Sequence, residues 1–317
     1  MEREWLEALR ERLVPRPPVT IGVGDDAAAI QCRADEELIV TTDLLSDGVD
    51  FVVGAVSSER IGHKALAVNL SDLAAMGARP VAAFVSLCLP HAGARELAEG
   101  LYAGLLPLAE RFDCQIAGGD TNSWPGKLTI SVTALGVVPA GAAWKRSGAR
   151  PGDWLLATGS FGGSLLGRHL DVQPRVREAL ALRELLQVRA AMDVSDGLSL
   201  DAARLADPSR CGIALDLDRI PISPDAERAA ASDATRGSPL DRALSDGEDF
   251  ELLLAVAPQE AAAFLAERSD ILGTPLRKIG EFVAEAGLWS VSHDAPMLVP
   301  LVPRGWEHGG ASEGSDA

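Results

Sequence analysis

Residues 63–88 read HKALAVNLSDLAAMGARPVAAFVSLC, and this stretch sets the fold class. Its first part predicts a helix over 59–76, which Gly77 and Pro80 would end. Its second part predicts a strand over 81–88. Similar elements flank it, and we expect them at residues 37–42 (strand), 94–112 (helix) and 128–138 (strand). Alternating strands and helices indicate an α/β (α+β) fold.

A second domain is expected after residues 139–152, because PAGAAWKRSGARPG is rich in Gly, Pro and Ala. Beyond it the pattern predicts a strand at Trp154–Thr158, a turn GSFGGS and a helix from Ser164. The segments AAMDV, SDGLSLDAARLA and ELLLAV predict a strand, a helix and a strand. We therefore predict an N-terminal domain at 1–140, a C-terminal domain at 150–306 and a disordered polar tail at 307–317.

The composition excludes several classes of protein. The 317 residues carry 46 acidic and 29 basic side chains, a formal charge of −17, whereas a nucleic-acid-binding protein usually shows a basic surface. No apolar run is long enough to cross a bilayer. Four scattered cysteines give no zinc or disulfide pattern. The charged amphipathic N-terminus differs from a secretory signal, so a cytoplasmic location is expected.

The aspartates lie at the ends of predicted elements and beside small residues. Asp43 ends the predicted strand in TTD, and Asp72 lies three residues after Asn69 on one face of the predicted helix. The other acids in such positions are Asp25, Asp26, Asp120, Asp193, Asp196, Asp246, Glu248, Asp249 and Glu251. Singly, each has a structural explanation, such as a turn former, a helix N-cap or a solvated helix position.

Taken together, the acids predict a site for hard cations. Two like charges about 4 Å apart repel by roughly 4 kcal/mol at an effective dielectric of 20, so converging carboxylates need counter-ions. Oxygen ligands without a His or Cys cluster favour Mg²⁺ or Mn²⁺. Because Mg²⁺ is usually shared with substrate phosphates, the site is expected to handle a polyphosphate.

Other chemistries find weaker support in the sequence. TGSFGGS at 158–164 follows a strand, and its amides could hold an anion, but it is neither a P-loop nor a dinucleotide fingerprint, and a tight turn is an equal alternative. Arg146 could clamp a phosphate or be a solvated linker charge. Ser195 lacks a nucleophile elbow. We therefore expect direct, metal-assisted phosphoryl transfer with no side-chain nucleophile.

The order of the motifs resembles that of the thiamine-monophosphate kinases, within the aminoimidazole-ribonucleotide-synthetase-like superfamily. The resemblance covers residues 22–306 and rests on GDDAA, TTD, HKALAVNLSDLAAMGARP, AGGDT, KRSGARPGD, DVSDGL and GEDFEL. It implies a two-domain protein that dimerises through an N-terminal mixed-sheet domain forming a barrel across the two-fold axis, followed by a C-terminal α/β sandwich domain. It also implies the reaction of ATP with thiamine monophosphate to give ADP and thiamine diphosphate.

The resemblance also implies roles for individual residues. The implied Mg²⁺ ligands are Asp26, Thr41, Thr42, Asp43, Asp72, Asp120, Asp193 and Asp196. The implied ATP contacts are Gly119, Asp120, Arg146 and Ser195. The implied contacts to the thiamine substrate are Asp50, Glu248 and Trp306, whose indole suits a cationic ring. Several Mg²⁺ ions would bring two anionic substrates together, which explains the scarcity of Lys and Arg.

Two departures from the family pattern concern the acceptor. Asp50 stands where the family usually has a substrate-contacting His, and Asp246 stands where it usually has Gly. Alternatives therefore include another ATP-dependent phosphotransferase or synthetase of the superfamily with a different small acceptor, and a non-catalytic nucleotide-binding regulator. The sequence lacks the reactive N-terminal Cys typical of selenophosphate synthetases and the Cys-containing tail of the hydrogenase-maturation protein.

Overall fold

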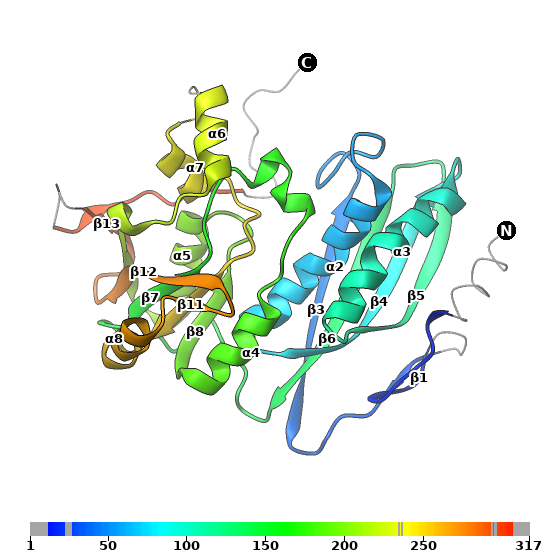
Figure 1. Ribbon diagram of the computed structural model, residues 1–317, viewed down its shortest axis with the longest axis horizontal. Coiled ribbons are helices and arrows are strands. Elements are labelled where there is room, and N and C mark those ends of the chain that lie inside the picture. Colours follow the sequence, from blue (N-terminus) through cyan, green and yellow to red (C-terminus); the bar gives the residue numbers. More distant parts are fainter. Residues whose placement is uncertain are drawn as a thin grey trace. The chain divides into compact units, whose positions relative to one another are not determined.

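The computed structural model describes residues 12–22, 27–233, 235, 237–292, 294 and 297–306. The chain divides into two compact units, and Figure 1 labels most of their helices and strands. The first unit comprises residues 1–144 and 170–185, and the second comprises 145–169 and 186–317. Residues 1–11 of the charged N-terminus and the expected disordered tail at 307–317 lie outside the described residues.

The first unit is built on a four-stranded sheet with the order β3–β6–β4–β5. Only β4 and β5 pair in parallel, so the sheet is mixed. A short antiparallel pair, β1 and β2, precedes it. The elements of this unit are β1 (Val19–Ile21), β2 (Ala29–Ile30), β3 (Glu36–Ser46), α2 (Ser58–Ala75), β4 (Arg79–Pro90), α3 (Ala94–Arg111), β5 (Gln115–Trp124), β6 (Thr129–Pro139) and α4 (Val176–Leu185).

Helices α2 and α3 lie side by side over one face of this sheet (Figure 1). Two glycines let their backbones touch. A Cβ atom on Gly62 would lie 1.9 Å from the Leu101 carbonyl oxygen, and one on Gly104 would lie 1.7 Å from the Glu59 carbonyl oxygen. Ser57 caps the N-terminus of α2, where its hydroxyl accepts a hydrogen bond from the Arg60 amide. Helix α2 is therefore fixed in place by backbone contacts.

The structure corrects two predictions about strands in this unit. Strand β3 runs to Ser46, so Thr41, Thr42 and Asp43 lie in the middle of a strand, paired with Ala134, Thr133 and Val132 of β6, rather than at its end. Strand β5 was not predicted, because its Gly118–Gly119 pair reads as a turn. Parallel pairing with β4 nevertheless holds this segment extended.

The second unit contains an eight-stranded mixed sheet. Its main path has the order β14–β13–β9–β12–β7–β10–β8, and β11 pairs with β12 off this path. The strands are β7 (Trp154–Thr158), β8 (Val188–Asp193), β9 (Gly212–Asp216), β10 (Leu252–Val256), β11 (Asp270–Ile271), β12 (Thr274–Val283), β13 (Gly287–Val291) and β14 (Val299–Pro300). The α-helices are α5 (Leu198–Ala206), α6 (Pro224–Ser232), α7 (Pro239–Ser245) and α8 (Pro258–Glu267).

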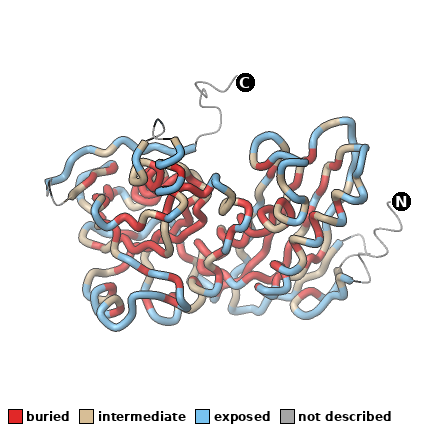
Figure 2. The backbone as a smooth tube through the Cα atoms, turned by 45° about the horizontal axis from the view of Figure 1, so that its top comes forward, coloured by how far each residue is buried: buried red, intermediate tan, exposed pale blue. Residues whose placement is uncertain are grey.

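A single apolar core lies between this sheet and helix α5. It includes Leu155, Phe161, Leu205 and Phe282, all fully buried (red in Figure 2). The helix expected from Ser164 is wrong, because the chain there forms two short 3₁₀ turns, Ser164–Leu166 and Arg168–Leu170. Two further 3₁₀ turns, Asp207–Ser209 and Leu217–Arg219, flank β9. The predicted mixed α/β fold class is confirmed for both units.

Strand β3 is an edge strand with an apolar outer face. Leu38, Val40 and Leu44 are 43%, 57% and 65% exposed, although apolar side chains of alternating residues usually face a core. The barrel across a two-fold axis involves a second copy of the chain and stays a prediction. In the part of the chain that is described, no helix is long and apolar enough to cross a membrane.

Candidate functional site

The acidic residues of the first unit meet where β3 faces α2. The Thr41 hydroxyl donates a hydrogen bond to Asp72 Oδ2 over 2.5 Å, joining the strand to the helix. Asp43 lies two residues further along β3 and therefore points to the same face as Thr41. Thr41 and Asp43 therefore lie on the face of β3 that meets Asp72 of α2.

Asp43 is the most perturbed acid of this group. Its pKa is raised to about 7, mainly by burial and also by the charges of Asp72 and Asp50. Its Oδ2 atom is buried and has no hydrogen-bond partner, and no described Lys or Arg forms an ion pair with it. A buried carboxylate oxygen without a partner is costly. The donor set therefore fits a bound cation.

Asp50 closes the turn that follows β3. Its Oδ2 accepts a hydrogen bond from the Ser46 amide over 2.7 Å, and its carbonyl oxygen accepts one from Lys64 Nζ over 3.0 Å. Asp47 likewise accepts a hydrogen bond from the Val53 amide. The Asp50 carboxylate thus has a structural task in addition to its electrostatic influence on Asp43.

Asp120 is not part of this acidic group. In the sheet, Asp120 of β5 lies opposite Ser86 of β4, Ser86 lies opposite Ser131 of β6, and Ser131 lies opposite Leu44 of β3. Asp120 therefore points to the same face as Leu44. Asp43 instead aligns with Val132, so register places Asp120 and Asp43 on opposite faces. Asp120 is exposed and accepts a hydrogen bond from the Thr121 amide.

Two further residues predicted as Mg²⁺ ligands are Thr42 and Asp26. Thr42 points to the face opposite Asp43, where its hydroxyl donates to the Val132 carbonyl oxygen and accepts from Thr133. Asp26 lies outside the described residues. Gly119 permits the close pairing of β5 with β4, because a Cβ there would lie 1.9 Å from the Val85 carbonyl oxygen.

In the second unit, three segments meet beyond the end of β8. The Glu248 amide donates to the Ser195 carbonyl oxygen over 2.6 Å, and the Trp306 amide donates to the Asp196 carbonyl oxygen over 2.8 Å. Asp193 is the last residue of β8 and is buried. The structure therefore brings together the predicted residues Asp193, Ser195, Asp196, Glu248 and Trp306.

Several acids of the second unit pair with arginine. Arg204 forms ion pairs with Asp196 and Asp201. The Asp201 carboxylate also accepts hydrogen bonds from the amides of Asp196 and Gly197, over 2.8 and 3.1 Å. Burial raises the pKa of Asp201 to about 6, while these two amides and Arg204 act in the opposite direction. Asp201 therefore binds the two backbone amides that precede α5, whose N-cap Gly197 has no side-chain cap.

The loop at 158–164 is a tight turn whose amides are already used. The Gly162 amide donates to the Asp249 carboxylate over 3.0 Å, and the Gly163 amide donates to Asp246 Oδ2 over 2.8 Å. Gly163 precedes a 3₁₀ turn of three residues rather than an α-helix. The structure thus favours the turn over the anion cradle for this loop.

Arg146 and Trp306 both present their side chains to solvent. Arg146 is exposed in a segment whose backbone is held by Ser209, which accepts hydrogen bonds from the Gly148 and Ala149 amides. Trp306 is 55% exposed although its backbone is anchored at Asp196. Such side chains remain available to a ligand.

Sequence reasoning missed two charged residues that shape these groups. Lys64 is 1% exposed and holds the turn of Asp50, and it lies in the quoted motif HKALAV. Its position among apolar helix residues was the available signal. Arg168 forms an ion pair with Asp249, 81 residues away, and no local pattern identifies such a pair.

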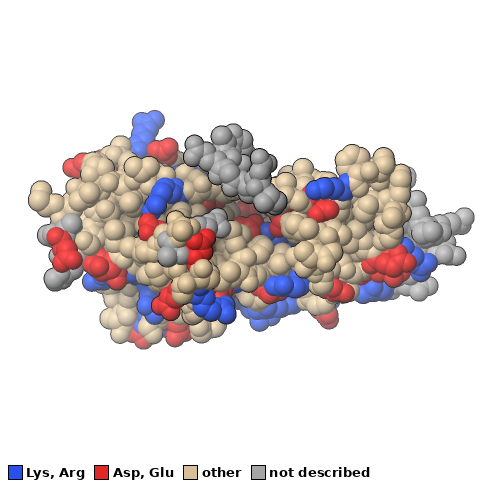
Figure 3. All heavy atoms as spheres, turned by 90° about the horizontal axis from the view of Figure 1, so that it is seen from above, with Lys and Arg blue, Asp and Glu red and all other residues tan. Residues whose placement is uncertain are grey.

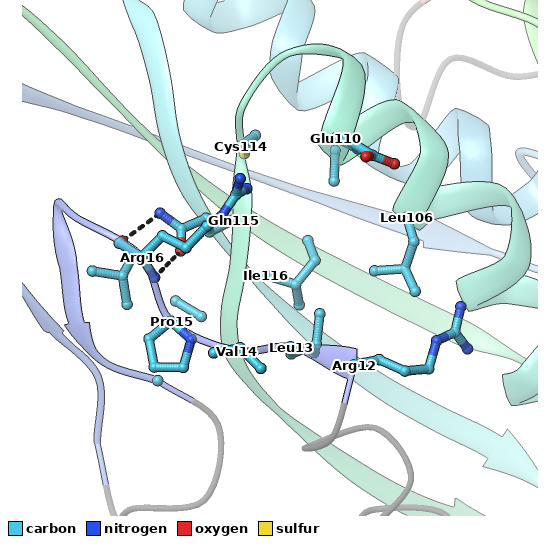
Figure 4. A pocket seen from close by; sticks show the side chains of 14 residues that line it. Arg12, Leu13, Val14, Pro15, Arg16, Leu106, Glu110, Cys114, Gln115 and Ile116 are labelled. Carbon is cyan, nitrogen blue, oxygen red and sulfur yellow. Dashed lines mark hydrogen bonds between the residues drawn. The ribbon is translucent and has the colours of Figure 1, made fainter.

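A cavity of about 510 Å³ lies elsewhere in the first unit, between the segment from Arg12 to Gly22, helix α3 and strand β5 (Figure 4). None of the predicted site residues lines it. Gln115 on its wall exchanges two hydrogen bonds with the Arg16 backbone, so this polar side chain is already satisfied. The cavity is therefore not the candidate site.

No group of three or more His, Cys, Asp or Glu residues that could hold a metal occurs within the described ranges. Three of the implied ligands, Thr41, Asp43 and Asp72, lie together in the first unit. On the face drawn in Figure 3, Lys and Arg side chains lie singly or in small groups among acidic ones. That face shows no broad basic surface.

Comparisons with known proteins agree with the motif order. Residues 24–138 match the family model of the AIR synthase related protein N-terminal domain, and residues 134–289 match that of the C-terminal domain. The thiamine-monophosphate kinase of Rhodopirellula baltica is 44% identical over 316 residues, which cover 98% of each chain.

Solved structures give the same picture. The crystal structure of thiamine-monophosphate kinase from Stenotrophomonas maltophilia superimposes with a TM-score of 0.77 at 36% identity, covering 90% of this chain and 94% of that one. A structure described as AaThiL complexed with AMPPCP and TMP superimposes with a TM-score of 0.75 at 27% identity, covering 97% of this chain and 96% of that one.

Proposed function

Because the chain belongs to the thiamine-monophosphate kinase family of AIR synthase related proteins, we propose that it phosphorylates thiamine monophosphate with ATP. The products are thiamine diphosphate and ADP. The AaThiL structure with AMPPCP and TMP supports both substrates, since it holds a nucleotide analogue together with the acceptor. We further propose that the transfer is direct and in line, at a site that holds several Mg²⁺ ions.

The single observation that carries the metal proposal is the state of Asp43. Its buried Oδ2 has no hydrogen-bond partner, and its pKa is raised to about 7, mainly by burial. Both features are expected of a carboxylate that binds a cation. Asp72 and Thr41 lie beside it in the first unit. Asp193 and Asp196 remain proposed Mg²⁺ ligands in the second unit. When bound, Mg²⁺ would neutralise the phosphates and align them.

The acceptor needs little activation by the protein. Its nucleophile is a phosphate oxygen that is already anionic at neutral pH, so no strong general base is required. The protein's task is to bind two anionic groups close together and in line. This agrees with a site rich in aspartate, in which no described residue forms a nucleophile–base pair.

The second unit would hold the thiamine part of the acceptor. Glu248 and Trp306 lie beside Ser195 and Asp196 and carry a negative charge and an exposed indole, both of which attract a cationic heteroaromatic ring. Asp50 is proposed to act near the acceptor through its charge, since its carboxylate already closes a turn. Gly119, Asp120, Arg146 and Ser195 remain the proposed ATP contacts.

We also propose that the protein is a cytoplasmic homodimer. The exposed Leu38, Val40 and Leu44 form an apolar stripe on an edge strand, and a second copy of the chain would cover it. Thiamine monophosphate and ATP are the proposed partners, with neither nucleic acid nor membrane involved. A cytoplasmic enzyme would have direct access to ATP.

The test is a product assay with a panel of acceptors. Purified protein with Mg²⁺ and ATP is incubated separately with thiamine monophosphate, thiamine, and other small phosphate acceptors, and products are separated by chromatography. We expect thiamine diphosphate to form and EDTA to stop the reaction. Consumption of a different acceptor without any thiamine diphosphate would favour another phosphotransferase, and binding of ATP without turnover of any acceptor would favour a regulator.

A further inference from the structure

The turn at residues 246–251, between α7 and β10, has an unusual backbone. Glu248 and Phe250 have φ angles of 52° and 51°. Gly247, which precedes Glu248, has a φ angle of 74°. Residues other than glycine rarely adopt this left-handed region, because their Cβ atom meets the backbone. Such conformations persist only where the surroundings fix them.

The surroundings of this turn do fix it, residue by residue. The amides of Glu248 and Phe250 donate to the carbonyl oxygens of Ser195 and Val194. The Ser164 hydroxyl donates to the Gly247 carbonyl oxygen over 2.6 Å. The backbone of Glu248 is therefore held between the end of β8 and the loop at 158–164.

Asp249 provides the charged part of this support. Its side chain is fully buried, and it accepts hydrogen bonds from the Gly162 amide over 3.0 Å and from Arg168 Nη2 over 2.7 Å. It lies next to Glu248 in the chain, so any displacement of Asp249 moves Glu248. A buried carboxylate of this kind requires its cation.

Arg168 connects the turn to two other parts of the unit. Besides Asp249, its guanidinium donates to the carbonyl oxygens of Ser160 and Gly162 and lies 3.7 Å from Asp225 of α6. Arg168 thus joins the loop at 158–164, helix α6 and the turn of Glu248. An ion pair with Asp249 alone would not require these additional hydrogen bonds.

We propose that Arg168 is a positioning residue for the acceptor, which holds Glu248 in its left-handed conformation through Asp249 and thereby sets the affinity for the thiamine ring. This inference rests on the proposed function, because it assigns Glu248 to the acceptor. Arg168 itself touches neither substrate. Its loss shifts the binding of thiamine monophosphate and leaves the binding of ATP unchanged.

The test compares Arg168→Met with Arg228→Met in the full-length protein. Arg228 also forms an ion pair with Asp225 but is mostly exposed on α6 and does not touch the turn, which makes it a matched control. For Arg168→Met we expect the KM for thiamine monophosphate to rise at least about tenfold, with the KM for ATP within about twofold of wild type. Arg228→Met should leave both values unchanged.

Two further variants separate positioning from general structural support. Arg168→Lys, which keeps the charge, should recover part of the lost affinity. In a Glu248→Ala background, Arg168→Met should raise the KM for thiamine monophosphate by less than about twofold, because the residue that it positions is already gone. A merely structural role would give multiplicative effects in the double variant and would raise the KM for ATP as well.

The outcomes are distinct from failure of the proposed function. If wild-type protein neither converts thiamine monophosphate nor binds it by calorimetry, the proposed function fails. If wild type does both and Arg168→Met retains its KM, or loses affinity for ATP equally, the positioning role is wrong. If Arg168→Met does not fold, the same KM values are measured for Arg168→Lys and for Asp249→Asn, which keeps an acceptor for the Gly162 amide. A raised KM for thiamine monophosphate alone would then support the positioning role, and unchanged KM values would contradict it.

Discussion

Asp43 of the first unit and the arginine-paired aspartates of the second unit lie in opposite electrostatic surroundings. In the first unit, Asp43 is half-buried with its Oδ2 atom fully enclosed near Asp72 and Asp50, and no described basic residue pairs with it. In the second unit, Arg204 pairs with Asp196 and Asp201, and Arg168 pairs with Asp249. The second group is neutralised by the protein, whereas the first is not.

This difference separates two uses of buried acids. The paired acids of the second unit accept backbone amides and build turns, and their charge is balanced on folding. Asp43 accepts no hydrogen bond at Oδ2 and gains nothing from folding in its charged form. We infer that the first group depends on a cation from solution, and each prediction below tests this contrast.

The largest effect is expected for Asp43→Asn. Loss of the charge that would bind Mg²⁺ should lower kcat/KM for thiamine monophosphate at least about a thousandfold. The same variant should melt no lower than wild type without Mg²⁺, because it removes a repulsive buried charge. Both are measured with a coupled ADP-release assay and thermal unfolding in EDTA. Asp47→Asn is the control, and an Asp43→Asn enzyme within tenfold of wild type would contradict the metal role.

Asp201→Ala should act on stability instead. It leaves the amides of Asp196 and Gly197 without their acceptor and removes one of the two ion pairs of Arg204, which should lower the free energy of unfolding by about 2–4 kcal/mol. Urea denaturation followed by circular dichroism measures this. Glu227→Ala, at an exposed position of α6, should change the free energy by less than about 0.5 kcal/mol. A loss that Mg²⁺ reverses would place Asp201 at the metal site and weaken the contrast.

The stability of the metal-free protein should fall as the pH rises. A carboxyl group whose pKa is raised on folding binds its proton more tightly in the folded state. For Asp43, its contribution to the free energy of unfolding is therefore complete below pH 3.8 and is lost as the pH rises through about 7. We expect Asp43 to account for about 2 kcal/mol between pH 5 and pH 8.

The comparison that isolates this contribution is wild type against Asp43→Asn, unfolded by urea over the same pH range. Asp201 and Asp249, with pKa values raised by burial to about 6 and about 8, titrate equally in both proteins. Saturating Mg²⁺ should remove the difference by favouring the charged carboxylate. Identical pH profiles for the two proteins would show that Asp43 does not titrate in this range.

The smallest expected effect is a difference in Mg²⁺ dependence between variants of two neighbouring threonines, Thr41 and Thr42. The Thr41 hydroxyl donates to Asp72, whereas the Thr42 hydroxyl donates to the Val132 carbonyl oxygen on the opposite face. Thr41→Val should therefore raise the Mg²⁺ concentration needed for half-maximal rate about tenfold, and Thr42→Val by less than about threefold. Mg²⁺ titrations of the initial rate decide this. Equal shifts would mean that both hydroxyls, or neither, support the metal ligands.

Much of the first unit was predictable because its signals are local. The helix expected at 59–76 is observed at Ser58–Ala75, and the strand expected at 81–88 lies within Arg79–Pro90. Strand β5 was not predicted because Gly118 and Gly119 resemble a turn, and a local sequence pattern does not indicate parallel pairing with a neighbouring strand. The same pairing placed Asp120 on the face opposite Asp43, which sequence spacing could not reveal.

In the second unit the motifs located the site but not what supports it. The segments DVSDGL and GEDFEL contain Ser195 and Glu248, which the structure joins by a backbone hydrogen bond, and the roles implied for their residues stay predictions. Arg168 lies outside both motifs, and its ion pair with Asp249 joins residues 81 positions apart. Ion pairs at such separations depend on the tertiary fold, so they were beyond local reasoning.

The backbone contact between α2 and α3 has a consequence for how this enzyme could evolve. Gly62 and Gly104 leave no room for any side chain, so the spacing of these helices is set by main-chain atoms rather than by replaceable side chains. Because α2 carries Asp72, a substitution at either glycine would displace a proposed metal ligand. Selection for new acceptors is therefore directed away from this helix pair and toward the turns at 46–51 and 246–251, where side chains can change without moving Asp72.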